Sequence, residues 1–285
     1  MSFIRAVCFG VSVTVVATVL TASPAWAQDA APPAVVATGA PVLVVTGGLD
    51  FVNQYNFRGI RQNTDGVSIW PYVDFGFTPY RGTGGLKAFT FNVGSWNAIH
   101  SQINEEDFGT GNKWYESDFY ATAGFGFSAA SLSFTYTSYT SPADLFSHVK
   151  ELSVKFGADD TAALGRAALK PYALVAFELT DDAQADAGAA KGTYLELGVA
   201  PGYAGTKASF AVPVKFGFSL SDYYEFGGED EKFGYFSIGG IVTVPLGAHL
   251  NIHGGGEFQT FGDSVSDYND QDTAGIFSIG LGFAF

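Results

Sequence analysis

The C-terminal stretch of the sequence reads Gly275-Ile-Phe-Ser-Ile-Gly-Leu-Gly-Phe-Ala-Phe285. From Phe277 to Phe285 every second residue is bulky and apolar, and the residues between them are small. Successive side chains of a β-strand point to opposite faces, so this period of two predicts a strand with one apolar face. The apolar face continues to the last residue, an aromatic one, with no polar tail behind it.

A terminal aromatic residue that closes an alternating strand resembles the sorting and assembly signal of Gram-negative outer-membrane barrels. The residues that carry this resemblance are Phe277, Ile279, Leu281, Phe283 and Phe285. The resemblance implies recognition by the barrel assembly machinery and insertion into the outer membrane. A buried C-terminal strand in a soluble β-sandwich is the alternative that the same alternation allows.

The first 27 residues are typical of a secretory signal peptide. Arg5 precedes an uncharged run over residues 6–20, and Ala25-Trp-Ala27 forms a small-residue cleavage site. The run is short for the roughly 20 residues that a spanning helix needs. We therefore predict export with cleavage before Gln28. The single cysteine, Cys8, lies in this segment, which leaves no disulfide in the exported chain.

Residues 28–42 are rich in Ala and Pro and predict a flexible periplasmic lead-in before the folded domain. The formal net charge of -14 argues against nucleic acid as a partner. Hydrophobic residues make up 47% of the sequence and aromatic residues 16%, yet no apolar run of helix length follows residue 27. Dispersed apolar residues of this kind are typical of a transmembrane β-barrel, in which closure of the sheet pairs every backbone polar group.

Windows that match a period of two predict twelve strands, with ten or fourteen as alternatives. In the fourth, one face carries Tyr115 and Phe119 and the other carries Glu116 and Asp118. The predicted fold over residues 43–285 is an antiparallel, up-and-down transmembrane barrel. Its predicted strands span residues 43–58, 66–78, 85–97, 114–127, 131–139, 149–157, 169–179, 192–200, 208–220, 233–245, 248–259 and 275–285.

The predicted connections alternate between short and long, as outer-membrane barrels alternate periplasmic turns with outer loops. Both chain ends then lie in the periplasm. The predicted outer loops hold most of the acidic residues, which either bind divalent cations bridging to lipopolysaccharide, steer cationic solutes, or simply keep the loops solvated. These residues are Glu105, Glu106, Asp107, Asp181, Asp182, Asp186, Asp222, Glu225, Glu229, Asp230, Glu231, Asp263, Asp267, Asp270 and Asp272.

The acidic stretch near the C-terminus does not fit a calcium-binding loop. Counting from Asp270 places Gly275 at position six, but position twelve is Leu281 rather than a bidentate Glu. The four histidines, His100, His148, His249 and His253, lack the spacing of a metal site. The sequence therefore predicts no metal and no cofactor.

Serine and histidine are adjacent at His100-Ser101 and at Ser147-His148. Neighbouring residues of one strand point to opposite faces, so neither pair can supply a nucleophile and its base. Neither lies in the His-x-Ser-Asn-Gly arrangement of the barrel phospholipases. We predict no catalytic residue, and an outer-membrane lipid hydrolase is the third choice of function.

The strand faces opposite the apolar ones predict the lining of the lumen. Twelve strands tilted about 40° enclose a barrel of roughly 25 Å diameter, which side chains narrow to a small channel or fill. Eight acids face four bases, so an open pore would weakly prefer cations, unless these charges pair across the lumen. The predicted lining is Asp50, Arg58, Trp70, Tyr72, Asp74, Glu116, Asp118, Tyr120, Glu151, Lys155, Lys170, Tyr172, Glu178, Tyr194, Glu196, Lys215, His253 and Glu257.

The segment Tyr55-Asn-Phe-Arg-Gly-Ile-Arg-Gln62 is similar to the Y-x-F-R-G-x-x-Q motif of the TorF-like porins, an uncharacterised proteobacterial outer-membrane family. The resemblance implies a passive channel without a known solute. Within the motif, we expect Gly59 to turn the first strand into the first outer loop and Arg58 to pair with Asp118 or Asp74. The predicted function is a porin for small hydrophilic solutes or ions, and the alternative is a non-conducting structural or surface-binding barrel.

Overall fold

The computed structural model describes residues 43–63, 66–102, 113–180, 190–226 and 229–285. The predicted signal peptide and lead-in lie outside these residues, as do Glu105, Glu106, Asp107, Asp181, Asp182 and Asp186 of the predicted acidic loops. Within the described residues, no helix is long and apolar enough to cross a membrane.

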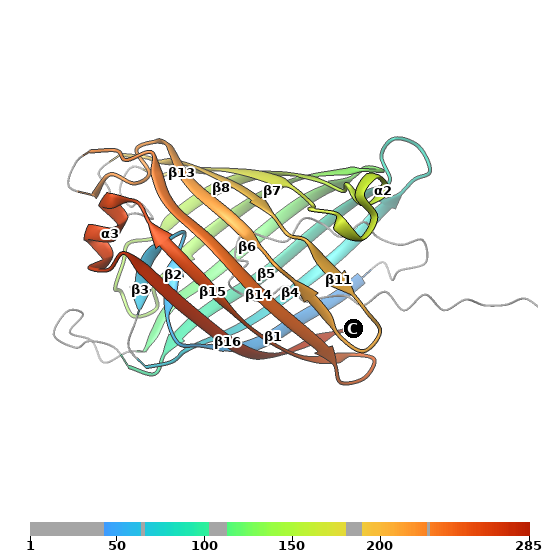
Figure 1. The fold of residues 1–285 in the computed structure, drawn as a ribbon, viewed down its shortest axis with the longest axis horizontal. Coiled ribbons are helices and arrows are strands. Elements are labelled where there is room, and N and C mark those ends of the chain that lie inside the picture. The colour runs from blue at the N-terminus through green and yellow to red at the C-terminus, as the bar shows by residue number, and fades with distance from the viewer. Residues whose placement is uncertain (1–42, 64–65, 103–112, 181–189, 227–228) are drawn as a thin grey trace, which may run out of the picture.

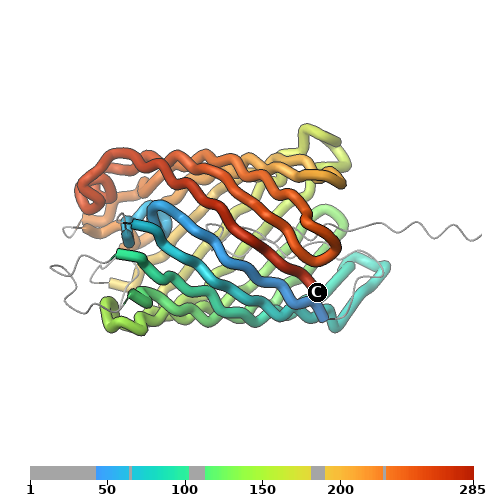
Figure 2. Tube along the Cα trace, turned by 90° about the horizontal axis from the view of Figure 1, so that it is seen from below, coloured from blue at the N-terminus to red at the C-terminus, as the bar shows by residue number. Residues whose placement is uncertain are grey.

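The described residues form a closed antiparallel barrel of twelve strands, which confirms the predicted fold class (Figure 1). The barrel strands are β1 (Leu43–Val52), β4 (Ser68–Arg81), β5 (Ala88–His100), β6 (Trp114–Gly126), β7 (Ala130–Thr140), β8 (Val149–Ala158), β9 (Tyr172–Glu178), β10 (Thr193–Val199), β13 (Val214–Ser221), β14 (Phe233–Pro245), β15 (Leu250–Phe261) and β16 (Thr273–Ala284). Each strand pairs with its neighbours in the chain, and β1 pairs with β16 to close the barrel (Figure 2).

Two short strands extend this barrel at one place. β11 (Gly202–Ala204) continues β10, and β12 (Ser209–Ala211) precedes β13. The interruptions fall at Pro201 and Pro213, where the missing N–H removes a ladder hydrogen bond. Fourteen strand segments therefore make twelve barrel strands.

The C-terminal strand has the predicted faces. Phe277 is 66% exposed and Leu281 is 54% exposed, as suits side chains that meet lipid. Phe285 exchanges two backbone hydrogen bonds with Val45, so the terminal residue takes part in closing the barrel. The His249 ring stacks on the Phe285 ring with a centroid separation of 4.8 Å.

The predicted lipid-facing position of Tyr115 is wrong. The register between β5 and β6 shifts between Ala98 and Ile99, so one extra residue of β6 turns the side chains inward beyond that point. Tyr115 is 7% exposed and faces the lumen, while Trp114 is 45% exposed. A bulge of this kind shifts the alternation by one residue, and a strict period of two does not detect it.

The longer connections lie at the end of the barrel opposite the C-terminus, together with the helix α3 (Asp263–Asn269) (Figure 1). The helices α2 (Thr161–Leu164) and η1 (Gly165–Ala167) lie at the other end, in the turn between β8 and β9. In outer-membrane barrels the short turns face the periplasm. We therefore call the end that carries α3 the outer end and the end that carries α2 the periplasmic end.

The first strand is shorter than predicted. β1 ends at Val52 rather than at residue 58, and the following residues form a separate hairpin of β2 (Tyr55–Phe57) and β3 (Ile60–Asn63). This hairpin pairs with no barrel strand. Its side chains Tyr55, Phe57, Arg58 and Ile60 are at most 8% exposed, so it is packed inside the barrel.

Candidate functional site: a hairpin packed in the lumen

The hairpin turns at Arg58 and Gly59, which both have positive φ, 48° and 86°. Two central residues with positive φ are what a two-residue type I′ turn requires. Glycine adopts this conformation freely, whereas a residue with a Cβ pays about 1 kcal/mol for it. Gly59 therefore supports a turn, as predicted, but the turn reverses the hairpin inside the lumen instead of leading the strand outward.

Three other motif residues, Tyr55, Phe57 and Gln62, contact one wall of the barrel, formed by β6 and β7. The Tyr55 hydroxyl donates to the Glu116 carboxylate on β6 at 2.8 Å. The Phe57 ring lies 5.5 Å from the Tyr139 ring on β7, measured between centroids. The Tyr115 hydroxyl donates to Oε1 of Gln62. The short motif thus describes how the hairpin fits the barrel.

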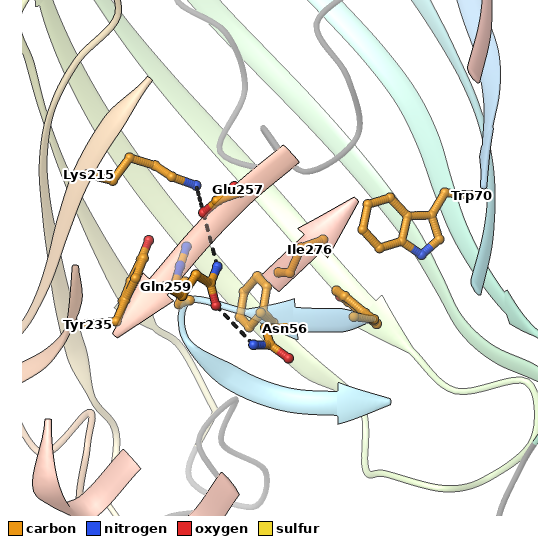
Figure 3. A pocket seen from close by; sticks show the side chains of 10 residues that line it. Asn56, Trp70, Lys215, Tyr235, Glu257, Gln259 and Ile276 are labelled. Carbon is orange, nitrogen blue, oxygen red and sulfur yellow. Dashed lines mark hydrogen bonds and ion pairs between the residues drawn. The ribbon is translucent and has the colours of Figure 1, made fainter. Parts of the chain in front are cut away.

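The opposite side of the hairpin contacts β15. Nδ2 of Asn56 donates to Oε1 of Gln259 at 2.9 Å, and Nε2 of Gln259 donates to Glu257 at 3.0 Å. Figure 3 shows this chain of contacts continuing to Lys215, whose Nζ lies 3.4 Å from Glu257. A small cavity of about 30 Å³ lies beside the hairpin at this point, with Trp70 on its far side.

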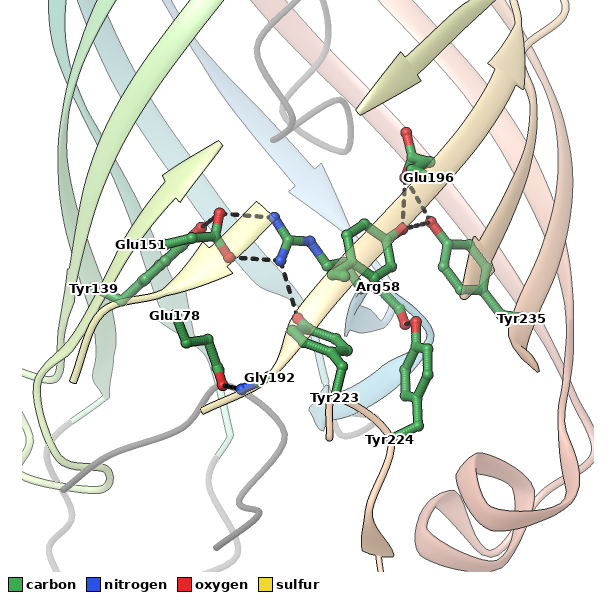
Figure 4. A network of polar contacts seen from close by, with 10 residues as sticks. Arg58, Tyr139, Glu151, Glu178, Gly192, Glu196, Tyr223, Tyr224 and Tyr235 are labelled. Carbon is green, nitrogen blue, oxygen red and sulfur yellow. Dashed lines mark hydrogen bonds and ion pairs between the residues drawn. The ribbon is translucent and has the colours of Figure 1, made fainter. Parts of the chain in front are cut away.

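Arg58, at the tip, is the most strongly bound residue of the hairpin. Its two terminal nitrogens donate to the two carboxylate oxygens of Glu151 on β8, at 2.6 and 2.9 Å. A third hydrogen bond runs to the Tyr223 hydroxyl at 3.1 Å, and the guanidinium carbon lies 4.3 Å from the centroid of the Tyr194 ring. Figure 4 shows this network. Both charged side chains are 2% exposed.

The predicted partners of Arg58 were therefore wrong, although a lumenal carboxylate does bind it. The prediction treated Arg58 as the last residue of the first strand. The hairpin instead carries Arg58 across the lumen to β8. Asp74 accepts a hydrogen bond from Asn92 at 2.8 Å, and Oδ1 of Asp118 has no hydrogen-bond partner among the described residues.

Outer loops hold the backbone of the tip. The Tyr224 hydroxyl donates to the Arg58 carbonyl at 2.9 Å, and Nδ2 of Asn269 donates to the Gly59 carbonyl at 2.7 Å. The Arg61 N–H donates to Oδ1 of Asn269 at 2.8 Å. Asn269 is fully buried at the end of α3. Sequence analysis placed this residue in an acidic loop and assigned it no role.

A second polar cluster lies next to the tip and is centred on Glu196 of β10. The hydroxyls of Tyr172, Tyr194 and Tyr235 all donate to its carboxylate, at 2.7, 2.9 and 2.9 Å. Three donors satisfy a buried carboxylate without a cation. The Tyr194 ring, which stacks on the Arg58 guanidinium, is thereby fixed in position.

An aspartate–histidine pair and a lysine also lie in the barrel wall. Nε2 of His253 lies 2.7 Å from Oδ1 of Asp50, and both side chains are fully buried. They meet above Gly280, their common cross-strand partner on β16. Lys155 lies 4.1 Å from the centroid of the Tyr172 ring.

The structure places the predicted lining residues on the inner face, with one exception. Lys170 is exposed in the turn after η1, where its N–H donates to Asp160. The other residues are buried or half-buried: Asp50, Arg58, Trp70, Tyr72, Asp74, Glu116, Asp118, Tyr120, Glu151, Lys155, Tyr172, Glu178, Tyr194, Glu196, Lys215, His253 and Glu257. Sequence analysis missed Tyr139, Tyr223, Tyr224, Gln259 and Asn269, which come from loops and strands far from the motif.

Lumenal tyrosines lie against the wall instead of projecting across it. Tyr72 covers Gly48 on the neighbouring strand, and Tyr120 covers Gly94 in the same way. A Cβ at either glycine would collide with the ring. These tyrosines therefore narrow the lumen less than their size suggests.

Serine and histidine residues meet between strands instead of within one. Oγ of Ser68 lies 2.9 Å from Nδ1 of His100 in a buried pair, and Oγ of Ser138 lies 2.6 Å from Nε2 of His148 in an exposed one. No described carboxylate lies within ion-pair distance of either histidine. Among the described residues, no group of three or more His, Cys, Asp or Glu side chains could hold a metal ion.

No family model matches the chain, and no curated protein matches it. Similar solved structures include an outer-membrane channel from Pseudomonas putida F1, 12% identical with a TM-score of 0.50, covering 90% of this chain and 100% of that one. Another is a NanC porin, 9% identical with a TM-score of 0.45, covering 85% and 98%. A third is outer membrane phospholipase A from Escherichia coli, 11% identical with a TM-score of 0.45, covering 84% and 95%.

At these identities the similarity shows the fold alone. The fold is that of the outer-membrane β-barrels, a class whose members differ in function. The similarity of residues 55–62 to the TorF-like porins stays a prediction.

Proposed function

We propose that this chain is a constricted channel of the Gram-negative outer membrane that passes small hydrophilic solutes or ions. The observation that carries the proposal is a closed barrel with an apolar exterior, whose polar lumen holds one hairpin that is separate from the barrel sheet. The hairpin is held by hydrogen bonds, by the ion pair of Arg58 with Glu151 and by apolar contacts of Tyr55, Phe57 and Ile60. The polar contacts among these can be exchanged for water or solute without changing the barrel.

We further propose a weak preference for cations. The inner face carries eight acids against Arg58, Lys155 and Lys215, with His253 beside Asp50. Arg58 and Lys215 lie against Glu151 and Glu257, which leaves an excess of carboxylates along the lumen. Unpaired carboxylates in a low-dielectric wall attract cations and repel anions.

A non-conducting structural or surface-binding barrel is the second candidate. Dense packing of the hairpin against both walls favours it, because Tyr55, Ile60 and Tyr194 are at most 1% exposed. A catalytic role is not proposed, since the exposed pair of Ser138 and His148 has no described carboxylate to orient the histidine.

The proposed partners follow from the barrel surface. The apolar exterior would contact outer-membrane lipids, the acidic outer loops would approach lipopolysaccharide through divalent cations, and the C-terminal strand would be recognised by the barrel assembly machinery. Nucleic acid is not a proposed partner.

Single-channel recording of the refolded chain from Gln28 onward tests the proposal. We expect small discrete steps in a planar bilayer and, under a salt gradient, a reversal potential that shows cation preference. Steps with anion preference would support the proposed channel but refute its proposed preference for cations. Silence from protein that is shown to be folded by its heat-modifiable gel mobility would favour the structural barrel.

A further inference from the structure

The wall that faces the hairpin tip carries a concentration of carboxylates. Glu151 on β8 and Glu178 on β9 are direct cross-strand partners, an arrangement that is unfavourable for like charges. Glu116 and Asp118 follow on the same face of β6. Glu178 also accepts the Gly192 N–H at 2.6 Å. The base bound to Glu151 comes from the hairpin and not from the wall.

The groups around the Arg58 guanidinium form a site that matches its shape. The Glu151 carboxylate takes both terminal nitrogens in parallel, which a planar fork can satisfy and an ammonium group cannot. The Tyr194 ring supplies a face for the cation, and the Tyr223 hydroxyl accepts a third hydrogen bond. Tyr194 is itself fixed by Glu196, so two of the three groups, Glu151 and Tyr194, are held on the barrel strands β8 and β10.

The guanidinium reaches this site from a segment that is separate from the barrel sheet. The hairpin contributes no strand to the barrel, and its tip has a backbone conformation that is unusual for arginine. Glu151 and Tyr194 belong to barrel strands and Tyr223 to the loop that follows β13, whereas the group that fills the site belongs to a segment held by non-covalent contacts.

We propose that Glu151, Tyr194 and Tyr223 form a recognition site for solutes that carry a guanidinium group, and that Arg58 occupies this site as an internal ligand. This inference rests on the proposed channel function and names its solute class. A guanidinium solute that enters the lumen competes with Arg58 for Glu151. Its binding releases the hairpin tip, and the site then becomes part of the solute pathway.

Arg58→Gly is the variant that exposes the site, because glycine suits the positive φ at this position and removes the side chain. Ethylguanidinium, which is one carbon shorter than the missing side chain, is the probe, and ethylammonium is the matched control with equal charge. We expect saturable binding of ethylguanidinium at millimolar concentration by calorimetry in detergent, with ethylammonium about tenfold weaker. In a bilayer, the same probe should reduce the conductance of the variant.

A second substitution and a second readout keep the two proposals separable. Glu151→Gln added to Arg58→Gly should abolish the preference for ethylguanidinium. If no channel steps are recorded in the bilayer but calorimetry shows the preference for ethylguanidinium, the proposed site is supported and the proposed channel function is refuted. Equal binding of the two probes, or a preference that survives Glu151→Gln, would overturn the site. If Arg58→Gly does not fold, Arg58→Asn replaces it, since asparagine also tolerates positive φ.

Discussion

The two halves of the barrel are built from the same strands but are lined differently. Toward the outer end the inward side chains are large, and the hairpin packs among them. Toward the periplasmic end many of them are small, although Lys155 and Tyr172 also lie there. Large inward residues of the outer half include Trp70, Trp96, Tyr139, Tyr194 and Tyr235, and small ones of the periplasmic half include Thr90, Thr122, Ser133, Thr135 and Ser153. Closure of the barrel and filling of its lumen are therefore separate properties of the sequence.

The outer half resembles the core of a soluble protein. The Tyr55 ring lies 5.3 Å from the Trp70 ring and 5.5 Å from the Trp96 ring, measured between centroids. Aromatic pairs of this kind contribute about 0.5–1.5 kcal/mol each beyond burial of their area. The hairpin is thus stabilised by apolar packing on one side and by the Glu151 ion pair at its tip.

The largest effect on stability is expected at the Arg58–Glu151 pair. Arg58→Gly leaves a buried carboxylate without its cation, and such losses destabilise a protein by about 3–5 kcal/mol. Glu151→Leu should reduce stability by a similar amount because it leaves the buried Arg58 guanidinium without its carboxylate. The double variant should recover much of either loss. Urea unfolding in lipid vesicles measures the free energy of unfolding of the wild type, the two single variants and the double variant. Additive losses would show that the two residues act independently.

Reactivity of introduced thiols compares the two halves on a single strand. Asn92 and Ala98 both face inward on β5, but Asn92 is half-buried nearer the periplasmic end whereas Ala98 is fully buried in the outer half. Asn92→Cys should react quickly with a charged thiol reagent, and Ala98→Cys should react slowly. The chain from Gln28 onward has no other cysteine. Equal rates would mean that the outer half is open to water.

Gly280 tests the close approach of Asp50 and His253 above the wall. A Cβ at this position would collide with the Asp50 carboxylate and the His253 ring, so Gly280→Ala should destabilise the barrel by about 1–3 kcal/mol. Gly240→Ala is the matched control, because a Cβ there meets no atom within 4 Å. The two variants are compared by urea unfolding. Similar free energies of unfolding for Gly280→Ala and Gly240→Ala would contradict the expected collision at Gly280.

The smallest effect is expected in the periplasmic turn between β8 and β9. Hydrogen bonds from the N–H groups of Lys170 and Leu169 lower the pKa of the Asp160 carboxyl. A lowered pKa in the folded state gives stability that is present above the ordinary pKa and is lost as pH falls through the lowered one. Wild type should therefore be slightly more stable than Asp160→Asn at neutral pH, and the difference should vanish in acid. A difference that persists in acid would contradict this assignment.

Most of the barrel could be predicted from the sequence because a lipid environment imposes a simple rule. Every strand needs an apolar outer face, so the alternation in the C-terminal strand recurs around the barrel and gives the number of strands. The rule fails where a residue does not face lipid. Tyr115 is turned inward by a bulge, and the apolar residues Tyr55 and Phe57 continue the pattern of β1 although the strand has ended.

The candidate site was predicted in composition but not in its contacts. Alternation alone identified Glu151 and Glu196 as lumenal residues. It could not show that Arg58 crosses the lumen, because that path depends on a turn with two positive φ angles. Arg-Gly is a weak turn signal beside Asn-Gly or Asp-Gly. The contacts of Tyr223 and Asn269 join residues more than 160 positions apart, and no local pattern predicts them.

The central claim is that the hairpin, and not the barrel wall, closes the outer half of the lumen. Replacing residues 54–63 by a short Gly-Ser linker and recording single channels tests this claim most directly. Replacement of residues 161–167, which form the exposed α2 and η1 at the other end, is the control. We expect a several-fold rise in conductance for the hairpin variant and none for the control. An unchanged conductance in a folded hairpin variant would show that the wall itself closes the lumen.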